Sequence, residues 1–365
     1  MTTRTSAPID IARRDIAAGH YAGAALVAAR GGRIVFEHYE GLAGPGLPSR
    51  PDVLWPIASI SKLHAVAAIL ALVERGEISL DVRVCDVLPA YVGDGKEEMR
   101  LRHLLTHTGG MIAESPNMER HLVAQAPLAT LVEEMMAAPL RFRPGTSAAY
   151  ADFHTLLAGQ VVATATEIPF AQLVHDLVLA PMGLVDTFFP TPAEHDARTA
   201  TIRGPLADGT AGAMYNSRHA RGLPHAAFAV TASARDMVRF LSHFAPGGPR
   251  ILSEATVRAM TTNQTGLTAF GSFPGILAYE QVGPRPWGYG FALQTRATPG
   301  IFSERASFSA FGHGGASGCE AFVDPEHDVT IVVATNTHIR IGADAWFARL
   351  HALTNAMMIE ATSVS

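Results

Sequence analysis

The order of strand-like and helix-like segments along this 365-residue chain is the feature that most limits its fold. Residues 22–29 form an apolar run of strand length, and Gly31-Gly32 turns it into the partly alternating segment 33–39, which predicts a hairpin. Strand patterns return only towards the end of the chain, at 288–294, 318–323 and 328–335, with a tight turn at 325–327. The sheet is therefore expected to be built from both ends of the chain.

Most other segments have helical apolar spacing. The predicted helices cover 9–19, 59–76, 101–107, 127–138, 155–165, 169–179, 236–244 and 343–360. We therefore predict an α/β (α+β) fold, in which an antiparallel sheet is flanked by helices and a helical lobe is inserted. Residues 1–77 and 222–365 would form the sheet domain and 78–221 the mainly helical domain, with a cleft between them. The Gly- and Pro-rich segment 262–286 is predicted to be a long loop.

Composition excludes several classes of function. The net charge is −5 and no basic stripe occurs, so nucleic-acid binding is not expected. Two cysteines do not make a disulfide framework, and no zinc or cofactor motif is present. No segment has membrane-spanning length, and the first residues do not resemble a signal peptide, so the expected location is cytoplasmic. The sequence leaves open whether the chain forms a homo-oligomer.

Lysine is scarce, because only two of the 28 Lys and Arg residues are lysine. Guanidinium stays protonated in proteins, whereas a desolvated ammonium can give up its proton. Lys62 follows Ser59 by three residues at a predicted helix start, so the two side chains share one face. The pattern alone is also typical of a serine N-cap beside a solvated lysine. Lys96, in the polar run 93–98, is predicted to be an ordinary surface lysine.

Two further motifs follow Ser59-x-x-Lys62 in order: Tyr150-Ala-Asp152 and His313-Gly-Gly315. Segment 102–111 (RHLLTHTGGM) lies between the first and second motifs, and segment 143–159 contains the second. The set resembles the serine β-lactamase and penicillin-binding-protein superfamily over about residues 20–355, and it implies the β-lactamase-like fold. The tyrosine of the second motif is similar to that of class C β-lactamases, D-amino-acid peptidases and family VIII carboxylesterases, and the last group is the nearest.

The resemblance implies roles for these residues. Ser59 would be the nucleophile, and Lys62 and Tyr150 would share the proton relay, either of them acting as base. The backbone N–H groups of Ser59 and Ala316 would form the oxyanion hole. Asp152 replaces the asparagine of β-lactamases and could hold Lys62 or orient Tyr150.

The third motif indicates which class of substrate is favoured. Its counterpart in β-lactamases, Lys-Thr-Gly or a near variant, binds the substrate carboxylate, whereas here the residues are His313, Gly314, Gly315 and Ala316. The fixed positive charge and the hydroxyl are both absent, which disfavours a carboxylate and favours a neutral ester. The two glycines would let a strand lie close to the substrate.

Other candidates rest on position alone. Trp287 and Tyr289 resemble the family's GYGxG strand and would wall the cleft or pack in the core. Met111 and Phe153 are candidate pocket residues, and His154 would line the cleft or pack. His103 and His107 have helical i, i+4 spacing but lack a third ligand, so they are predicted to be hydrogen-bonded structural histidines and not zinc ligands.

The leading hypothesis is a cofactor-free serine carboxylesterase that acts on a small-molecule ester through an acyl-enzyme. The alternatives are β-lactam or D-amino-acid peptide hydrolysis, with a protonated His313 binding a carboxylate, and acyl transfer to a small alcohol or amine. A catalytically silent binding homologue is the alternative of another class. The sequence does not reveal the acyl and alcohol groups.

Overall fold

The computed structural model describes residues 6–204, 214–266, 286–296, 298–341 and 343–363. Strands from both ends of the chain form one seven-stranded sheet, in the order β3-β2-β1-β10-β9-β8-β7. Its paired strands are antiparallel, and β1 lies between β2 and β10. The strands of the sheet are β1 (Gly23–Arg30), β2 (Arg33–Gly44), β3 (Leu47–Pro48), β7 (Ala292–Leu293), β8 (Phe311–Gly315), β9 (Cys319–Asp324) and β10 (Val329–Thr335). The predicted fold class is confirmed.

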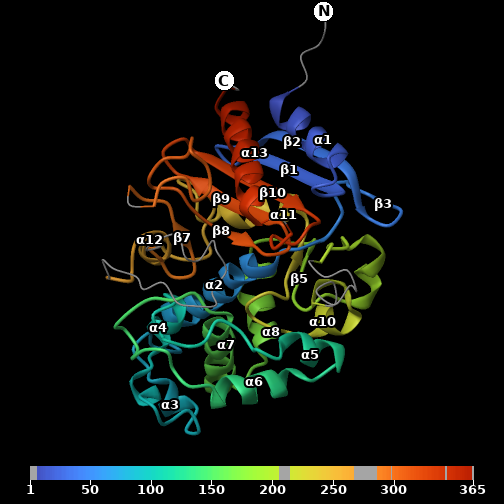
Figure 1. Ribbon diagram of the computed structural model, residues 1–365. Coiled ribbons are helices and arrows are strands. Elements are labelled where there is room, and N and C mark those ends of the chain that lie inside the picture. The colour runs from blue at the N-terminus through green and yellow to red at the C-terminus, as the bar shows by residue number, and fades with distance from the viewer. Residues whose placement is uncertain (1–5, 205–213, 267–285, 297, 342, 364–365) are drawn as a thin grey trace, which may run out of the picture.

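Helices cover both faces of this sheet (Figure 1). Alternate residues of β1 serve different cores: Ala24, Leu26 and Ala28 face α1 and α13, whereas Ala25 and Val27 share a core with α2 and α11. This explains why the segment is a continuous apolar run. The helices that pack on the sheet are α1 (Ala7–Ala17), α2 (Ser61–Glu74), α11 (Ala234–Ser242) and α13 (Ala343–Ser363). Two short helices, α10 (Arg218–Gly222) and α12 (Glu254–Thr261), precede and follow α11 along the chain.

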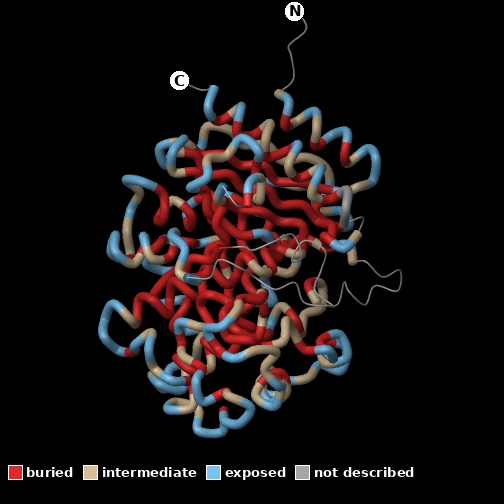
Figure 2. Tube along the Cα trace, turned by 60° about the vertical axis from the view of Figure 1, so that its left-hand side comes forward, coloured by how far each residue is buried: buried red, intermediate tan, exposed pale blue. Residues whose placement is uncertain are grey.

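The segment between residues 78 and 221 is mostly helical in the described part of the chain. Helix α7 packs against α2, α4, α6 and α8. Figure 2 shows that the buried band continues from the sheet through the centre of the molecule into this region. Its helices are α3 (Val84–Val87), α4 (Leu101–Leu105), α5 (Met118–Val123), α6 (Leu128–Ala137), α7 (Asp152–Thr166) and α8 (Phe170–Val174), with η2 (Lys96–Glu98), η3 (His175–Leu179) and η4 (Ala193–Arg198).

A small second sheet, β4-β6-β5, joins this region to the rest of the chain. Residues of β5 pair with β6, which also pairs with β4 just before the predicted nucleophile. The strands are β4 (Trp55–Pro56), β5 (Thr187–Phe188) and β6 (Thr231–Ala232), and the 3-10 turn η1 (Ala58–Ile60) follows β4. The domain boundaries at 77/78 and 221/222 stay a prediction.

Three local predictions were wrong. The strand predicted at 288–294 is reduced to β7, because Gly290 has a left-handed φ of 81° and interrupts the extended chain. Lys96 is buried and not solvated, because its long side chain reaches the carbonyl oxygen of Met136. His107 is not helical, since α4 ends at Leu105. Most of the predicted loop at 262–286 lies outside the described residues.

Candidate active site

Ser59 lies in the turn η1, directly before α2. The preceding residue, Ala58, has a left-handed φ of 47°, a conformation that costs a residue with a Cβ about 1–2 kcal/mol. Ala58 is buried against Ile202, Tyr215 and Ala316, and this packing holds the unfavourable conformation. Strained backbone of this kind is typical of functional sites and turns Ser59 away from a regular helix.

Lys62 is the centre of the polar contacts at this site. The side chain is 1% exposed, and its ammonium contacts a hydroxyl, a carbonyl and a carboxylate oxygen. Nζ donates to Ser59 Oγ (3.0 Å) and to the carbonyl oxygen of Ala227 (3.1 Å), and it forms an ion pair with Asp152 Oδ1 (2.6 Å). A buried ammonium needs such partners, because an unpaired charge in the interior is costly.

Tyr150 approaches Lys62 from the helical region. Its ring centre lies 4.7 Å from Lys62 Nζ, and Asp152, two residues later, is the first residue of α7. The Tyr150 ring stacks on Trp287, at 5.7 Å between ring centres and 24° between planes, and lies 5.8 Å from the ring of His313. The three predicted motifs thus meet at one place.

The third motif forms strand β8, which lies against the segment that leads into Ser59. A Cβ on Gly315 would come within 2.3 Å of the carbonyl oxygen of Ile57, so only glycine permits this approach. Gly314 is exposed, and Ala316 follows in the turn to β9. The backbones at Ser59 and Ala316 therefore lie on adjacent segments, as an oxyanion hole made by their N–H groups requires.

The hydrogen bond of His313 determines which ring nitrogen carries its proton. Nδ1 lies 2.6 Å from the carbonyl oxygen of Gly314. A carbonyl oxygen can only accept, so Nδ1 is the donor and Nε2 of the neutral ring carries a lone pair. Neutral His313 thus has no N–H left to offer a substrate carboxylate.

The protein-family model described as Beta-lactamase matches residues 9–354. The chain belongs to the β-lactamase family. The fold and the predicted family resemblance agree with this membership.

Several β-lactamase-family relatives are similar along most of their length. Esterase EstB from Burkholderia gladioli is 29% identical over 350 residues, which cover 86% of each chain. Penicillin-binding protein 4 from Amycolatopsis lactamdurans is 27% identical over 286 residues, which cover 75% of this chain and 69% of the relative. A crystal structure of a family VIII carboxylesterase superposes with a TM-score of 0.71 at 24% identity, covering 95% of this chain and 96% of the other.

Not every predicted site residue joins the cluster. Trp287 does, but Tyr289 belongs to the main hydrophobic core, and Met111 and Phe153 are also buried there. His154 is completely buried, and it packs beneath the site without lining an open cleft.

Sequence reasoning missed two contributors. The carbonyl oxygen of Ala227 accepts from Lys62, and a backbone acceptor leaves no signal in a single sequence. His107 was assigned a structural role, yet its ring lies 4.7 Å from that of Tyr150. The motif position of His107, five residues after Arg102, was the available signal.

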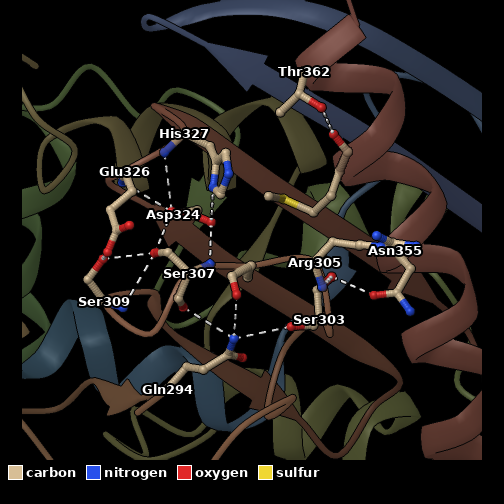
Figure 3. Close-up of polar contacts among 12 residues, drawn as sticks. Gln294, Ser303, Arg305, Ser307, Ser309, Asp324, Glu326, His327, Asn355 and Thr362 are labelled. Carbon is tan, nitrogen blue, oxygen red and sulfur yellow. Dashed lines mark hydrogen bonds and ion pairs between the residues drawn. The ribbon is translucent and has the colours of Figure 1, made fainter. Parts of the chain in front are cut away.

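Another serine, aspartate and histidine meet elsewhere in this β-lactamase-family chain (Figure 3). Asp324 accepts hydrogen bonds from Ser307 Oγ and from His327 Nδ1, both at 2.7 Å. Burial raises the pKa of Asp324, but the hydrogen bonds from Ser307 and His327 outweigh it and hold that pKa below its usual value. The aspartate lies between the other two side chains, so the histidine cannot take the serine proton, and the group is a structural clamp.

The described residues contain no group of three His, Cys, Asp or Glu side chains arranged to hold a metal ion. Within the same residues no helix is both long and apolar enough to span a bilayer.

Proposed function

We propose that this protein is a serine carboxylesterase that hydrolyses small neutral esters through an acyl-enzyme. The observation that carries the proposal is the contact of Lys62 Nζ with Ser59 Oγ at 3.0 Å, because a serine hydroxyl becomes a good nucleophile only beside a group that manages its proton. The similarity to esterase EstB supports the same substrate class.

In the proposed mechanism, Ser59 Oγ attacks the ester carbonyl carbon while its proton passes to the Lys62–Tyr150 pair. The carbonyl electrons move to the oxygen, which the backbone N–H groups of Ser59 and Ala316 stabilise. The tetrahedral intermediate then expels the alcohol, which takes the proton back, and leaves an acyl group on Ser59. Water repeats the sequence, releases the carboxylic acid and restores the hydroxyl.

The position of Asp152 indicates which of Lys62 and Tyr150 transfers the proton. A carboxylate 2.6 Å from Nζ stabilises the ammonium form, and the Ala227 carbonyl does so too. We therefore assign Lys62 the role of a cation that polarises Ser59 and Tyr150. Tyr150 then acts as a phenolate, which takes the proton from Ser59 and gives it to the leaving alcohol.

The third motif supports the preference for a neutral substrate. His313 donates through Nδ1 to the carbonyl oxygen of Gly314, so Nε2 of its neutral ring carries a lone pair. A substrate carboxylate facing Nε2 would be repelled by this lone pair. β-Lactams and D-amino-acid peptides carry such a carboxylate, and they are expected to be poor substrates. Trp287, whose ring stacks on Tyr150, would form one wall of the site. We further propose that the enzyme works in the cytoplasm without a cofactor.

The test is hydrolysis of short p-nitrophenyl esters by the wild type, by Ser59→Ala and by Ser61→Ala. Ser61 is the matched control, since its buried Oγ accepts from the backbone N–H of Val230. Activity should disappear in Ser59→Ala and persist in Ser61→Ala. Undiminished turnover by Ser59→Ala would refute the assignment.

Three additional measurements distinguish the alternatives. Efficient nitrocefin or D-Ala-D-Ala cleavage with poor ester turnover would indicate the amide-hydrolysing function. Ester product in place of acid when an alcohol is added would indicate acyl transfer. A wild-type chain that no fluorophosphonate labels at Ser59 would indicate a silent binding homologue.

A further inference from the structure

Two buried histidines, His107 and His154, lie behind Tyr150 and are joined to each other. Their Nδ1 atoms are 3.1 Å apart. The backbone N–H of Met111 donates to His154 Nε2, and the backbone N–H of Ala151 donates to His107 Nδ1, both at 3.4 Å. The structure therefore supplies enough contacts to determine where each ring carries its proton.

The assignment follows from the fact that a backbone N–H can only donate. His154 Nε2 and His107 Nδ1 both accept from the backbone, so neither carries a hydrogen. His154 must then carry its proton on Nδ1 and donate it to His107 Nδ1. In the neutral form, His107 consequently carries its proton on Nε2, on the opposite edge of its ring.

Both rings are held in the neutral form. Burial, together with the charges of His103 and Lys62, lowers the pKa of His154 to about 3. Burial also holds the pKa of His107 well below its usual value, with additional contributions from His154, Lys62 and His313. A protonated His107 beside Lys62 would place two cations in one buried site.

The backbone is shaped to keep this pair together. His107 has a left-handed φ of 57°, although it is not glycine. A Cβ on Gly109 would come within 2.7 Å of His154 Nε2, so the chain can fold over the ring only with glycine there. Such local strain persists when the surrounding packing requires it.

The other side of the His107 ring contacts the proposed proton carrier. Its centre lies 4.7 Å from that of Tyr150 and 4.6 Å from that of Trp287, which meets it nearly edge-on at 70°. Tyr150 thus lies close to His107 and also to the Lys62 ammonium, which is 4.7 Å from its ring centre.

We infer that His107 is a positioning residue for Tyr150, and that His154 keeps His107 neutral through their shared hydrogen bond. The inference rests on the proposed role of Tyr150 in ester hydrolysis. His107 fixes the plane of the phenol, and its neutrality leaves Lys62 as the cation that sets the basicity of Tyr150. The titratable groups that face the pair are Lys62 of α2, His103 of α4, Tyr150 before α7 and His313 of β8.

The experiment compares His107→Asn with His154→Asn, and uses His243→Asn as the matched control. His243 is also buried with a lowered pKa, but it lies at the end of α11, where burial and the charges of Arg250 and Arg239 act on it. In His107→Asn, kcat for a p-nitrophenyl ester should fall about tenfold or more while KM changes little, because substrate binding is untouched. His243→Asn should keep kcat within about twofold.

His154→Asn removes the ring that donates to His107 and with it one of the contributions that disfavour protonation of His107. The acid limb of the kcat/KM profile should then move upward by about one pH unit. An unmoved acid limb, or a His107→Asn kcat equal to that of the control, would overturn the inference. If His107→Asn does not fold, the acid limb of the kcat/KM profile of His154→Asn tests the inference by itself.

The role of His107 can also be tested without an ester substrate. The rate at which a fluorophosphonate labels Ser59 follows the same proton transfer and needs no ester. A wild type that is labelled but does not hydrolyse esters would disprove the carboxylesterase proposal, and the same variants would then still test His107 through the labelling rate.

Discussion

The two lysines of the chain are both buried, yet their surroundings differ in chemistry. Lys62 contacts a hydroxyl and a carboxylate, at Ser59 and Asp152. Lys96 is 5% exposed and donates to the carbonyl oxygen of Met136 at 2.7 Å, while its ammonium lies 5.3 Å from the ring centre of Tyr91. Burial raises the pKa of the Tyr91 phenol, so that group stays neutral beside Lys96.

The difference shows that burial alone does not make a lysine part of a reactive site. Lys96 connects the turn η2 to the end of α6, so its ammonium serves to hold two segments together. Lys62 lies where a strained turn, a helix start and a carboxylate converge, so a proton can move between its neighbours.

The largest effect is expected from replacing each lysine by methionine, which keeps the length and removes the charge. Lys62→Met should lower kcat/KM for esters about 10²- to 10⁴-fold, because the proton relay loses its cation. Lys96→Met should keep kcat/KM within about twofold, since Lys96 is remote from the chemistry. Steady-state kinetics on both folded variants measures the difference, and equal losses would erase the distinction between the two lysines.

Acid is expected to damage the Lys62 region first. Burial lowers the pKa of His64 and His225 to about 4 and that of His154 to about 3. Above pH 6.5 these rings are neutral in the folded and the unfolded chain. Between pH 6.5 and about 4 only the unfolded chain binds the protons, so each histidine removes about 1.4 kcal/mol of folding free energy per pH unit.

Urea denaturation at pH 8, 6.5 and 5 measures this loss. His64→Phe should make the decline shallower, because phenylalanine can keep the stacking on Phe240, 3.9 Å between ring centres, without titrating. Amide exchange at pH 5 should rise more in α2 than in α6, which adjoins Lys96. A free energy of unfolding that is flat from pH 6.5 to 5 would contradict the assignment of neutral buried histidines.

Asp152→Asn tests which group carries the proton. The substitution keeps the shape and removes the charge 2.6 Å from Lys62 Nζ. If Lys62 acts as a cation, its ammonium form loses support and kcat/KM should fall about 10- to 100-fold. If neutral Lys62 were instead the base, the same change would leave or raise the rate, and a kcat/KM profile over pH 6–9 would show it.

The sequence predicted the sheet, most helices and the meeting of the motifs, because periodicity and residue type carry that information. Ser59 and Lys62 follow from helical spacing, and Gly315 from the need for a close approach. The buried position of Lys96 was not predictable, since its polar neighbours in sequence suggest solvent. The Ala227 acceptor was also out of reach, because it depends on a carbonyl 165 residues away. Residue type therefore indicates that a lysine could take part in proton transfer, whereas its contacts in the folded chain show which of the two lysines is placed to do so.

The smallest effect is expected at Glu114, a second carboxylate near Asp152. Its neighbour Ala113 accepts from the backbone N–H of Asp152 at 2.6 Å, and its own carboxylate lies 3.5 Å from Arg340. Burial and then the charge of Asp152 raise the pKa of Glu114. The side chain is nevertheless 39% exposed, against 15% for Asp152, so water screens its pairing.

Glu114→Gln should therefore change kcat/KM by less than about threefold and the free energy of unfolding by about 0–1 kcal/mol. Asp152→Asn should be measured beside it, because the Asp152 side chain is less exposed than that of Glu114 and its partner is a buried lysine. A loss in Glu114→Gln as large as that in Asp152→Asn would mean that total negative charge near Lys62 matters more than the direct contact. The contrast between the two lysines would then rest on the electrostatic field of the region and no longer on a single carboxylate.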